Sequence, residues 1–408
     1  MRSLATIMVV VAAVAAADAD WLEWGGEGRD FNISDTTLSA WPDSGPREIW
    51  RRPLGDGYAT ILAESGILYT MYRSGDASES VIALDAKTGE EIWTYKHAAA
   101  LWEDFNTRFG PGPHSTPIIH GDNIYAIGVR GDVLALEKTS GKRIWLRKTW
   151  EELHAEPPGR GYASSPLIHN ERLVVPVGGR GQALVAFELD TGKVAWTSGS
   201  YKNAFSSPIL INVDGQDQIV MFFQAYVVGF NATTGKELWS HPHSTKYEVN
   251  AATPVWSDGN LLFLSSAYDK GGQVIQLSQK DGVTTVTERW FERKFQIHHG
   301  SAVRIGNAIH GSSGDFGPAF LVTADVETGK LLSRQRGFGK ANLMAVGNQV
   351  LLLDDDGTLA LAEPVADSLQ VKATAQVFDA RSWSAPTLVG TILYIRDQKQ
   401  IVALDLGK

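Results

Sequence analysis

Two adjacent histidines, His298 and His299, lie in the segment KFQIHHGSA at residues 294–302. Paired imidazoles can serve as metal ligands or as a catalytic base with its neighbour, and they can also be ordinary residues of a repeated structural element. Neighbouring side chains on an extended segment point in opposite directions, so only one of the two can face a given ligand. We therefore expect no metal site here, with His299 facing a ligand and His298 turned toward the protein interior. The alternative is a purely structural role, in which one imidazole bonds to the backbone.

The sequence contains no signature of a common catalytic class. H-E-x-x-H, a P-loop and a G-x-S-x-G elbow are all absent. The lack of cysteine excludes disulfides, thiolate metal sites and a cysteine nucleophile. A formal charge of -9 at pH 7, without a run of Lys and Arg, argues against binding of nucleic acid. Any site must therefore be assembled from residues that the fold brings together.

A repeated segment indicates what that fold is. ALDAKTGEEIW at 83–93 recurs as ALEKTSGKRIW at 135–145, AFELDTGKVAW at 186–196 and GFNATTGKELW at 229–239, with weaker copies at 275–290 and 323–333. In each strong copy a strand ends near an acidic or polar residue, a glycine supplies a positive φ, and a second strand starts. The unit is a β-hairpin, and we expect its terminal Trp to pack against the neighbouring repeat.

A second signature precedes each hairpin. It reads STPIIHGDNIY at 115–125, SSPLIHNERLV at 164–174, SSPILINVDGQ at 206–216, ATPVWSDGNLLF at 252–263 and SAPTLVGTILY at 384–394, with variants that start at Ala59, Gly300 and Ala341. Eight copies of four strands predict an all-β, eight-bladed β-propeller of four-stranded antiparallel blades. The last copy ends at 401–406 without an outer strand, and REIWRR at 47–52 can supply one. We therefore expect the N- and C-terminal strands to pair in one blade that contains Trp50.

This organisation resembles the PQQ-like eight-bladed β-propellers, a quinoprotein-type and BamB-like repeat family whose blade signature is A-x-D-x-x-T-G-x-x-x-W. The resemblance covers residues 21–406, within a single expected domain at 20–408. WLEWGGEGRDF, SWSAP and LYIRDQKQIVALDL are most similar to an exported bacterial group of this family.

Equivalent positions of the repeats predict where a site would be. The residues three and four places before each proline of the second signature should surround one mouth of the central channel, and aromatic and imidazole groups there suit a planar or sugar-like ligand. This candidate collar consists of Tyr58, His114, Tyr162, Phe205, Asn250, His299, Lys340 and Trp383. Long loops after Trp93 and Trp145 are further candidates, because function concentrates in such loops, although they can also be plain solvated segments. They offer Glu103, Asp104, Arg108, Glu151, Glu152, His154 and Arg160.

The N-terminus predicts export. Arg2 precedes an apolar run at 4–17 and an A-x-A site at 17–19, so we expect a Sec-type signal peptide at 1–19 and a mature protein that starts at about Asp20. The run is too short for a membrane anchor. A periplasmic or secreted location is expected, with no membrane insertion after cleavage.

Three functions are compatible with these features. The favoured one is an exported scaffold that binds a protein partner or a small polar or planar ligand, as the similar lipoprotein of the outer-membrane β-barrel assembly machine binds its partners; this chain lacks the lipid-bearing cysteine. The alternative is an alcohol or sugar dehydrogenase, for which the resemblance implies PQQ and Ca²⁺ as cofactors and an Asp base. The adjacent-cysteine ring and haem-attachment motif of many such enzymes are missing, and their Glu, Asn and Asp ligands have no match here. Carbohydrate binding at the collar, without chemistry, is the third.

Overall fold

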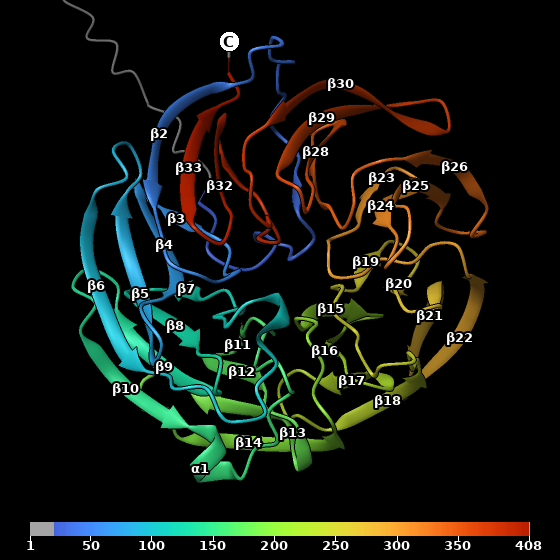
Figure 1. Ribbon diagram of the computed structural model, residues 1–408. Coiled ribbons are helices and arrows are strands. Elements are labelled where there is room, and N and C mark those ends of the chain that lie inside the picture. Colours follow the sequence, from blue (N-terminus) through green and yellow to red (C-terminus); the bar gives the residue numbers. More distant parts are fainter. Residues whose placement is uncertain (1–19, 408) are drawn as a thin grey trace, which may run out of the picture.

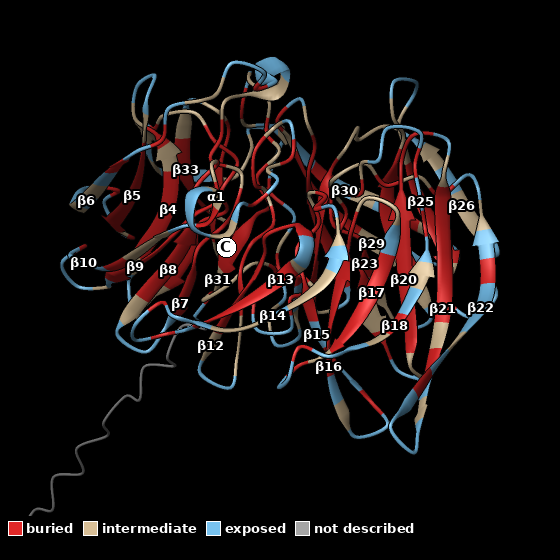
Figure 2. Ribbon diagram, turned by 90° about the horizontal axis from the view of Figure 1, so that it is seen from below, coloured by how far each residue is buried: buried red, intermediate tan, exposed pale blue. Residues whose placement is uncertain are grey.

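The computed structural model describes residues 20–407, and the predicted signal peptide lies outside them. Across the described residues, eight sheets are arranged like blades around a central channel, each with four antiparallel strands, and one of them carries a short fifth strand from the N-terminal segment (Figure 1). The predicted eight-bladed propeller is confirmed. Buried residues concentrate along the strands between blades, whereas turns and outer strands are more exposed (Figure 2).

Blades 1 to 4 follow each other along the chain, and each runs from an inner to an outer strand. Blade 1 consists of β3 (Leu62–Glu64), β4 (Ile67–Arg73), β5 (Ser78–Asp85) and β6 (Glu91–Ala98). Blade 2 consists of β7 (Ile118–His120), β8 (Asn123–Ile127), β9 (Asp132–Glu137) and β10 (Arg143–Lys148). Blade 3 consists of β11 (Leu167–His169), β12 (Arg172–Pro176), β13 (Gly179–Glu188) and β14 (Val194–Tyr201). Blade 4 consists of β15 (Ile209–Val213), β16 (Gln216–Phe222), β17 (Tyr226–Asn231) and β18 (Glu237–Pro242).

Blades 5 to 8 complete the ring. Blade 5 consists of β19 (Val255–Ser257), β20 (Leu261–Ser266), β21 (Gly271–Lys280) and β22 (Val283–Glu292). Blade 6 consists of β23 (Val303–Ile305), β24 (Ala308–Ser313), β25 (Phe320–Asp325) and β26 (Leu331–Arg336). Blade 7 consists of β27 (Asn342–Val346), β28 (Gln349–Leu353), β29 (Thr358–Val365) and β30 (Ser368–Gln376). Blade 8 consists of β31 (Thr387–Val389), β32 (Ile392–Arg396), β33 (Gln400–Asp405) and β2 (Arg47–Pro53). Two short helices, η1 (Thr107–Phe109) and α1 (Thr149–Leu153), lie in the long loops.

The pairing of β2 with β33 closes the ring, as predicted, and places Trp50 in blade 8. The same N-terminal strand therefore supplies the outer edge that the last repeat lacks. An ion pair between Arg47 and Asp405, 2.5 Å apart, lies at one end of this pairing, where the two residues face each other. Closure leaves no blade without a neighbour, which removes the open edges of a linear array.

The repeated hairpins are held by their own acidic or amide residue. Oδ1 of Asp85 accepts hydrogen bonds from the backbone N–H groups of Lys87 and Thr88 and from the Thr88 hydroxyl. Gly89 follows with φ of +71°, a conformation that costs an L-residue with a side chain about 1–2 kcal/mol. The D-x-x-T-G part of the signature therefore encodes a self-capped turn.

The signature tryptophans join each blade to the next. Trp93 donates its indole N–H to the carbonyl of Lys138, 3.0 Å away, and its ring covers Gly141 of blade 2. Equivalent bonds run from Trp50 to Ala86, from Trp145 to Leu189 and from Trp290 to Val326. Trp239 packs against blade 5 but turns its N–H back to Gln218 of its own blade, because blade 5 carries a longer hairpin without a Thr-Gly turn.

In blades 1 to 4, the residue before the proline of the second signature, or Thr60 at the equivalent position of the first copy, links the starts of neighbouring inner strands. The N–H of Thr60 donates to the hydroxyl of Thr116, the N–H of Thr116 to Ser165, and the N–H of Ser165 to Ser207. This chain of buried side-chain bonds sets the spacing of blades 1 to 4 around the channel. It explains why serine and threonine recur directly before the proline.

An N-terminal segment at 21–41 crosses the channel, and the sequence patterns do not predict this. Trp21 forms a bridge with Ala63 of blade 1, and β1 (Asn32–Ile33) pairs in parallel with β27 of blade 7. Between them, Arg29 is buried and donates hydrogen bonds to Glu23 and to the carbonyl of Pro166 in blade 3. Asp20 bonds to the N–H of Ser65 in the β3–β4 turn, at the end opposite to the inter-blade loops. The segment therefore forms a floor across that end.

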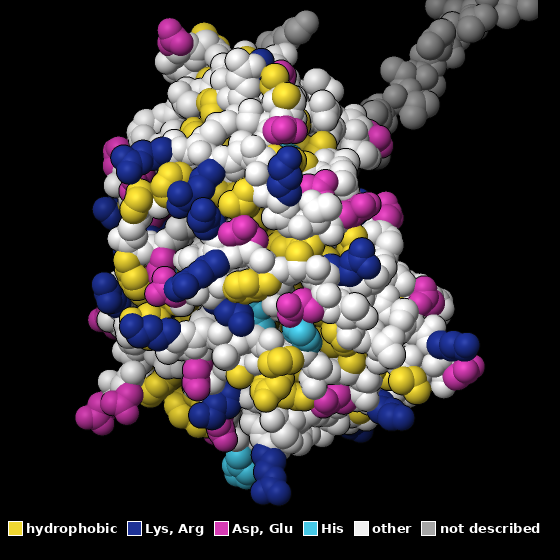
Figure 3. All heavy atoms as spheres, turned by 90° about the vertical axis from the view of Figure 1, so that its right-hand side faces the viewer, with side chains coloured by type: hydrophobic (Ala, Val, Ile, Leu, Met, Phe, Trp, Pro, Cys, Tyr) yellow, Lys and Arg dark blue, Asp and Glu magenta, His cyan; other side chains and the backbone are white. Residues whose placement is uncertain are grey.

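The outer surface carries mixed charges. On the face shown in Figure 3, Lys and Arg side chains are interspersed with Asp and Glu side chains, without one large patch of either sign. Within 20–407, no helix is both long and apolar enough to cross a membrane.

Candidate functional site

A cavity of about 140 Å³ lies where the inter-blade loops converge above the N-terminal floor. Its walls come from the loops that lead into blades 1 to 6 and blade 8, from the β20–β21 loop, and from Trp24 of the N-terminal segment. Trp24 is fixed by an indole N–H bond of 3.0 Å to the Thr253 hydroxyl of blade 5. We refer to this hollow as the axial cavity.

Five residues of the candidate collar line the axial cavity. They are Tyr58, His114, Phe205, His299 and Trp383. Each lies in a loop that leads into a different blade, so the repeat geometry brings them to one place. All five carry aromatic or imidazole rings, and the rings of four of them, all except Phe205, are in contact and give the cavity a continuous wall.

The structure does not bring the other three collar residues into the cavity lining. Tyr162 is buried in the body of the blades, where its hydroxyl donates to the carbonyl of Val177 at 2.7 Å. Asn250 is also buried, and its amide donates to backbone carbonyls that include Phe223 at 2.7 Å. Lys340 pairs with Asp355 at 3.4 Å. Tyr162 and Asn250 thus stabilise the loops rather than face the channel.

Both adjacent histidines line the axial cavity, which corrects the expectation that only His299 would do so. The expectation assumed an extended segment, but the chain bends at residues 299–300 and does not alternate like a strand. Gly300 allows this bent segment to approach the loop before blade 7 closely, since a Cβ there would lie 2.1 Å from the carbonyl oxygen of Ala341. The two imidazoles consequently stand edge to face, with ring centroids 5.1 Å apart.

The aromatic wall is continuous around Trp383. Its ring centroid lies 4.3 Å from His299, 5.3 Å from Tyr58 and 5.3 Å from Phe109. Tyr58 in turn stacks on His114 at 5.4 Å. Aromatic faces in this arrangement can hold a flat ligand with little loss of side-chain entropy.

Tyr268 and His298 form a hydrogen-bonded polar pair in the wall of the axial cavity. The Tyr268 hydroxyl lies 2.7 Å from Nε2 of His298, and burial with the nearby charge of Asp315 raises the pKa of Tyr268 to about 12. The tyrosine therefore keeps its proton at neutral pH and can donate it in this hydrogen bond. Within the described residues, Nδ1 of His298 has no hydrogen-bond partner.

The imidazoles of the cavity are neutral at neutral pH. Burial lowers the pKa of His114 to about 4 and that of His298 to about 3, and the positive charge of Arg160 acts in the same direction. Burial also lowers the pKa of His299 well below its usual value, with further contributions from His298 and Lys340. Neutral imidazoles can donate or accept hydrogen bonds without adding charge to the cavity.

The candidate residues of the two long loops lie in different places in the structure, and only one of them, Arg160, lines the axial cavity. Arg160 also shares a second hollow of about 320 Å³ with Asp104. Glu103 and Arg108 are exposed. The other three lie around α1, where Glu151 pairs with Arg130 at 3.7 Å, Glu152 accepts a bond from the Lys148 N–H, and His154 ends the helix in an exposed left-handed conformation.

Several lining residues were outside the sequence candidates. Trp24, Phe109 and Tyr268 line the cavity, and Arg381 lies over the Trp383 ring at 4.7 Å. Trp24 belongs to the non-repeated N-terminal segment, and Tyr268 to a β20–β21 loop that the comparison of repeats does not align. Phe109 and Arg381 are close in sequence to predicted positions, in the loops before blades 2 and 8, but no repeat copy marks them.

The cavity does not fit a calcium-bound quinone. Ca²⁺ requires six to eight oxygen ligands that include carboxylates, and no Asp or Glu lines the cavity. The described residues contain no cluster of three or more His, Asp or Glu side chains placed to hold a metal ion. The volume of the hollow is close to that which holds one benzene molecule, so a tricyclic cofactor would have to project out of it through the mouth.

Comparisons with known proteins agree on the architecture. A family model described as outer membrane protein assembly factor BamB matches residues 35–151 and 77–335. BamB of Burkholderia pseudomallei is 23% identical over 350 residues, which are 76% of this chain and 86% of that protein. The quinohemoprotein alcohol dehydrogenase ADH IIB of Pseudomonas putida is 28% identical over 144 residues, which are 34% of this chain and only 19% of that enzyme.

Two solved structures show the same fold at low identity. BamB from Moraxella catarrhalis superposes with a TM-score of 0.63 and 16% identity, covering 88% of this chain and 97% of that one. Quinohemoprotein alcohol dehydrogenase from Comamonas testosteroni superposes with a TM-score of 0.68 and 14% identity, covering 97% and 82%. The eight closed blades, their repeated signature and a family match over most of the chain together show that this protein belongs to the PQQ-like, BamB-like β-propeller family.

Proposed function

We propose that this protein is an exported binding scaffold, which recognises its ligand or partner at the channel mouth formed by the inter-blade loops. The observation that carries the proposal is the axial cavity, which combines an aromatic wall, neutral imidazoles and an arginine without an acidic partner. Concave, mostly apolar hollows with a few converging polar groups are typical binding sites. The ring supplies a rigid frame for loops that come from seven blades.

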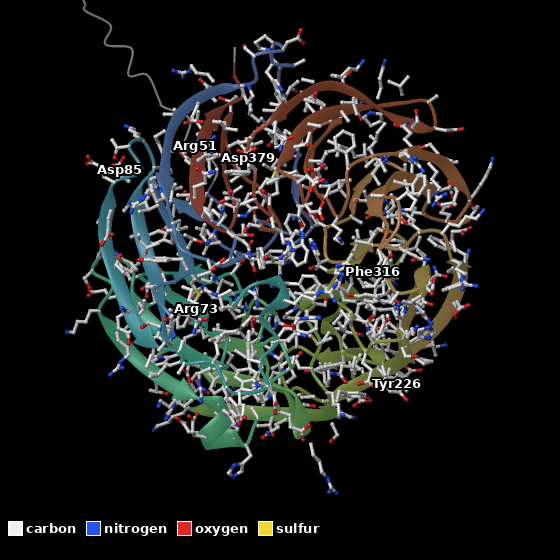
Figure 4. The ribbon with its side chains drawn as sticks, in the orientation of Figure 1. Arg51, Arg73, Asp85, Tyr226, Phe316 and Asp379 are labelled. Atoms are coloured by element: carbon white, nitrogen blue, oxygen red, sulfur yellow. The ribbon has the colours of Figure 1, made fainter. Side chains whose placement is uncertain are left out.

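Exposed aromatic residues beside the cavity support recognition of a larger partner. Phe316 and Tyr247 are 70% and 54% exposed, and both contact the ring of Tyr268 in the cavity wall. In Figure 4, Phe316 lies toward the centre of the ring, whereas Asp85 and Tyr226 lie at its periphery. Exposed aromatic side chains of this kind are enriched at protein interfaces. The names of the BamB relatives, as outer membrane assembly factors, agree with a protein partner.

The dehydrogenase alternative has no comparable support. No carboxylate is available in the cavity to hold Ca²⁺ or to act as the base, so the likeness to quinohemoproteins extends to the blades only. Carbohydrate binding without catalysis would use the same aromatic wall. A ligand screen that includes neutral oligosaccharides distinguishes this hypothesis from the protein-partner and dehydrogenase hypotheses.

The proposal is tested by site-specific cross-linking in the producing cell. A photoreactive residue in place of Phe316 should give a discrete adduct that is lost when Trp383→Ala is added. The matched control is Val283, which is 63% exposed at the start of β22, beside the β21–β22 turn; the β21–β22 hairpin extends to the lower edge of Figure 2. Equal adducts from both positions would contradict recognition at the mouth. Export is checked by N-terminal sequencing, which should find a start at about Asp20.

A further inference from the structure

We propose that the axial cavity binds a small aromatic anion, namely a single ring that carries one carboxylate. The inference rests on the proposed binding function of the channel mouth, and it specifies the chemistry of the ligand. Three properties of the cavity lead to it: its volume, the arrangement of its rings, and the sign of its charge.

The volume selects a single ring. A buried hollow of about 150 Å³ accommodates one benzene molecule in a protein interior. The axial cavity has about 140 Å³ and is floored by Trp24, whose indole is fixed to Thr253. A fused multi-ring ligand would have to displace this floor or project out of the hollow toward the channel mouth.

The rings of the wall favour a flat ligand. Trp383 lies between His299 and Phe109, and Tyr58 joins the same group at 5.3 Å from Trp383. An aromatic guest can pack against such faces in an offset-stacked or edge-to-face arrangement, each contact contributing beyond simple burial of area. Aliphatic ligands of equal volume would lack this contribution.

The charge of the cavity favours an anion. Arg160 lines the cavity, lies 4.7 Å above the Phe109 ring, and forms no ion pair with any of the described carboxylates. Its Nε atom is buried without a hydrogen-bond partner. Arg381, which likewise has no ion pair in the described chain, lies 4.7 Å above Trp383. Both arginines are partly exposed, and only the Nε atom of Arg160 is buried without a partner, so a carboxylate bound in the cavity would supply this group with a charge-assisted hydrogen bond.

Acidic groups lie near the wall but outside the lining of the axial cavity: Asp104 and Glu248 line the adjoining hollow with Arg160, and neither forms an ion pair within the described residues. Asp315 accepts a hydrogen bond from the backbone N–H of Tyr268 at 3.2 Å and does not line the cavity. Asp355 is paired with Lys340. Burial is the main cause of the lowered pKa values of the three cavity histidines, and the smaller contributions of Arg160, Lys340 and Arg381 in the same direction agree with a positive local potential.

The test is calorimetric titration of the full mature protein with three matched compounds. Benzoate should bind, benzyl alcohol should bind at least about tenfold more weakly because it lacks the charge, and acetate should not bind because it lacks the ring. Quenching of tryptophan fluorescence by benzoate provides an independent readout of occupancy beside Trp24 and Trp383.

Two arginine variants assign the charge. Arg160→Gln should weaken benzoate binding about 10- to 100-fold and leave benzyl alcohol unchanged, since only the anion loses a partner. Arg180→Gln, at an exposed arginine outside the cavity lining, should leave both unchanged. Circular dichroism melting of both variants checks that the fold is retained.

Each remaining outcome has a defined meaning. Equal binding of benzoate and benzyl alcohol, or an unaffected Arg160→Gln, would overturn the anionic class while leaving the mouth as a binding site. Failure of all three compounds to bind would overturn the inference itself. The proposed scaffold function is tested separately, by whether the cross-linked adduct from position 316 is lost in the Trp383→Ala variant.

Discussion

The imidazole of His299 packs against the indole of Trp383 with ring centroids 4.3 Å apart, although the two residues come from the loops before blade 6 and blade 8. Its neighbour His298 instead bonds to Tyr268 of blade 5. Two adjacent residues therefore hold together two different parts of the cavity wall. Their contributions to stability and to binding should be separable by mutation.

We expect the bond between His298 and Tyr268 to stabilise the fold measurably. His298→Ala leaves the buried hydroxyl of Tyr268 without this partner, which should lower the free energy of unfolding by about 1–3 kcal/mol. Tyr268→Phe should remove the same bond from the other side. Urea unfolding of both single variants and the double variant measures the coupling, expected at about 0.5–1.5 kcal/mol. Full additivity of the two changes would contradict the bond.

The docking of tryptophan on the next blade should be visible in a pair of glycine variants. A Cβ at Gly141 would lie 2.4 Å from the ring of Trp93, whereas a Cβ at Gly121 meets nothing within 4 Å. Both glycines have positive φ, so alanine costs each about 1–2 kcal/mol in backbone strain. Gly141→Ala should therefore lower the unfolding free energy more than Gly121→Ala. Equal losses would mean that the Trp93 contact carries little energy.

The architecture was predictable because the repeat encodes it several times over. The Asp of the D-x-x-T-G turn accepts hydrogen bonds from the backbone of the same turn, and the terminal Trp contacts the following blade. Both features can therefore be recognised from the sequence pattern. The same periodicity placed His114 and Trp383 in loops around one channel. The ring closure also followed, because the only outer strand missing at one end is present at the other.

The rest of the site depends on features that do not repeat. The N-terminal floor is held by individual contacts, such as the hydrogen bond from Arg29 to the carbonyl of Pro166, which no periodic sequence pattern predicts. The direction of the His298 side chain follows a local bend at residues 299–300 rather than strand alternation. Tyr162 and Asn250 occupy collar positions by alignment, but their polar atoms satisfy buried backbone groups, which decides their direction.

Ring closure should depend strongly on one side chain of β2. Trp50 donates its indole N–H to the carbonyl of Ala86 and its ring covers Gly89 of blade 1. Trp50→Ala should lower the unfolding free energy by about 3–5 kcal/mol, the usual range for loss of a packed tryptophan. Ile49→Ala is the control, because the adjacent side chain is 37% exposed and should cost little. Thermal melting compares them, and similar melting temperatures would contradict the closing role of Trp50.

Acidification should destabilise the protein through its buried neutral histidines. The pKa values of His243 and His310 are lowered by burial to about 3 and about 4. Above pH 6.5 both folded and unfolded states are neutral at these sites, and below it only the unfolded state gains the proton, so stability falls as pH drops from 6.5 toward 4. Raised carboxyl pKa values, such as that of Glu79 at about 8, act in the opposite sense over part of this range.

A single neutral substitution isolates the histidine share of that pH dependence. His310→Gln should reduce the slope of unfolding free energy between pH 6 and pH 5 by up to about 1.4 kcal/mol per pH unit. His154→Gln is the matched control, because His154 is exposed. The measurement is urea unfolding at both pH values. An unchanged slope in His310→Gln would show that this imidazole is not held neutral by burial.

The N-terminal floor should set the size of ligand that the axial cavity accepts. Trp24→Ala removes the indole that closes the hollow from below, so a two-ring anion such as naphthoate should gain affinity relative to benzoate. Trp41→Ala is the control, because Trp41 is buried in the same N-terminal segment but does not line the cavity. Both variants should lose stability, since each deletes a packed ring, but only Trp24→Ala should change the ratio of the two affinities. Calorimetry with both compounds measures this ratio, and an unchanged ratio in Trp24→Ala would mean that the floor does not limit the ligand.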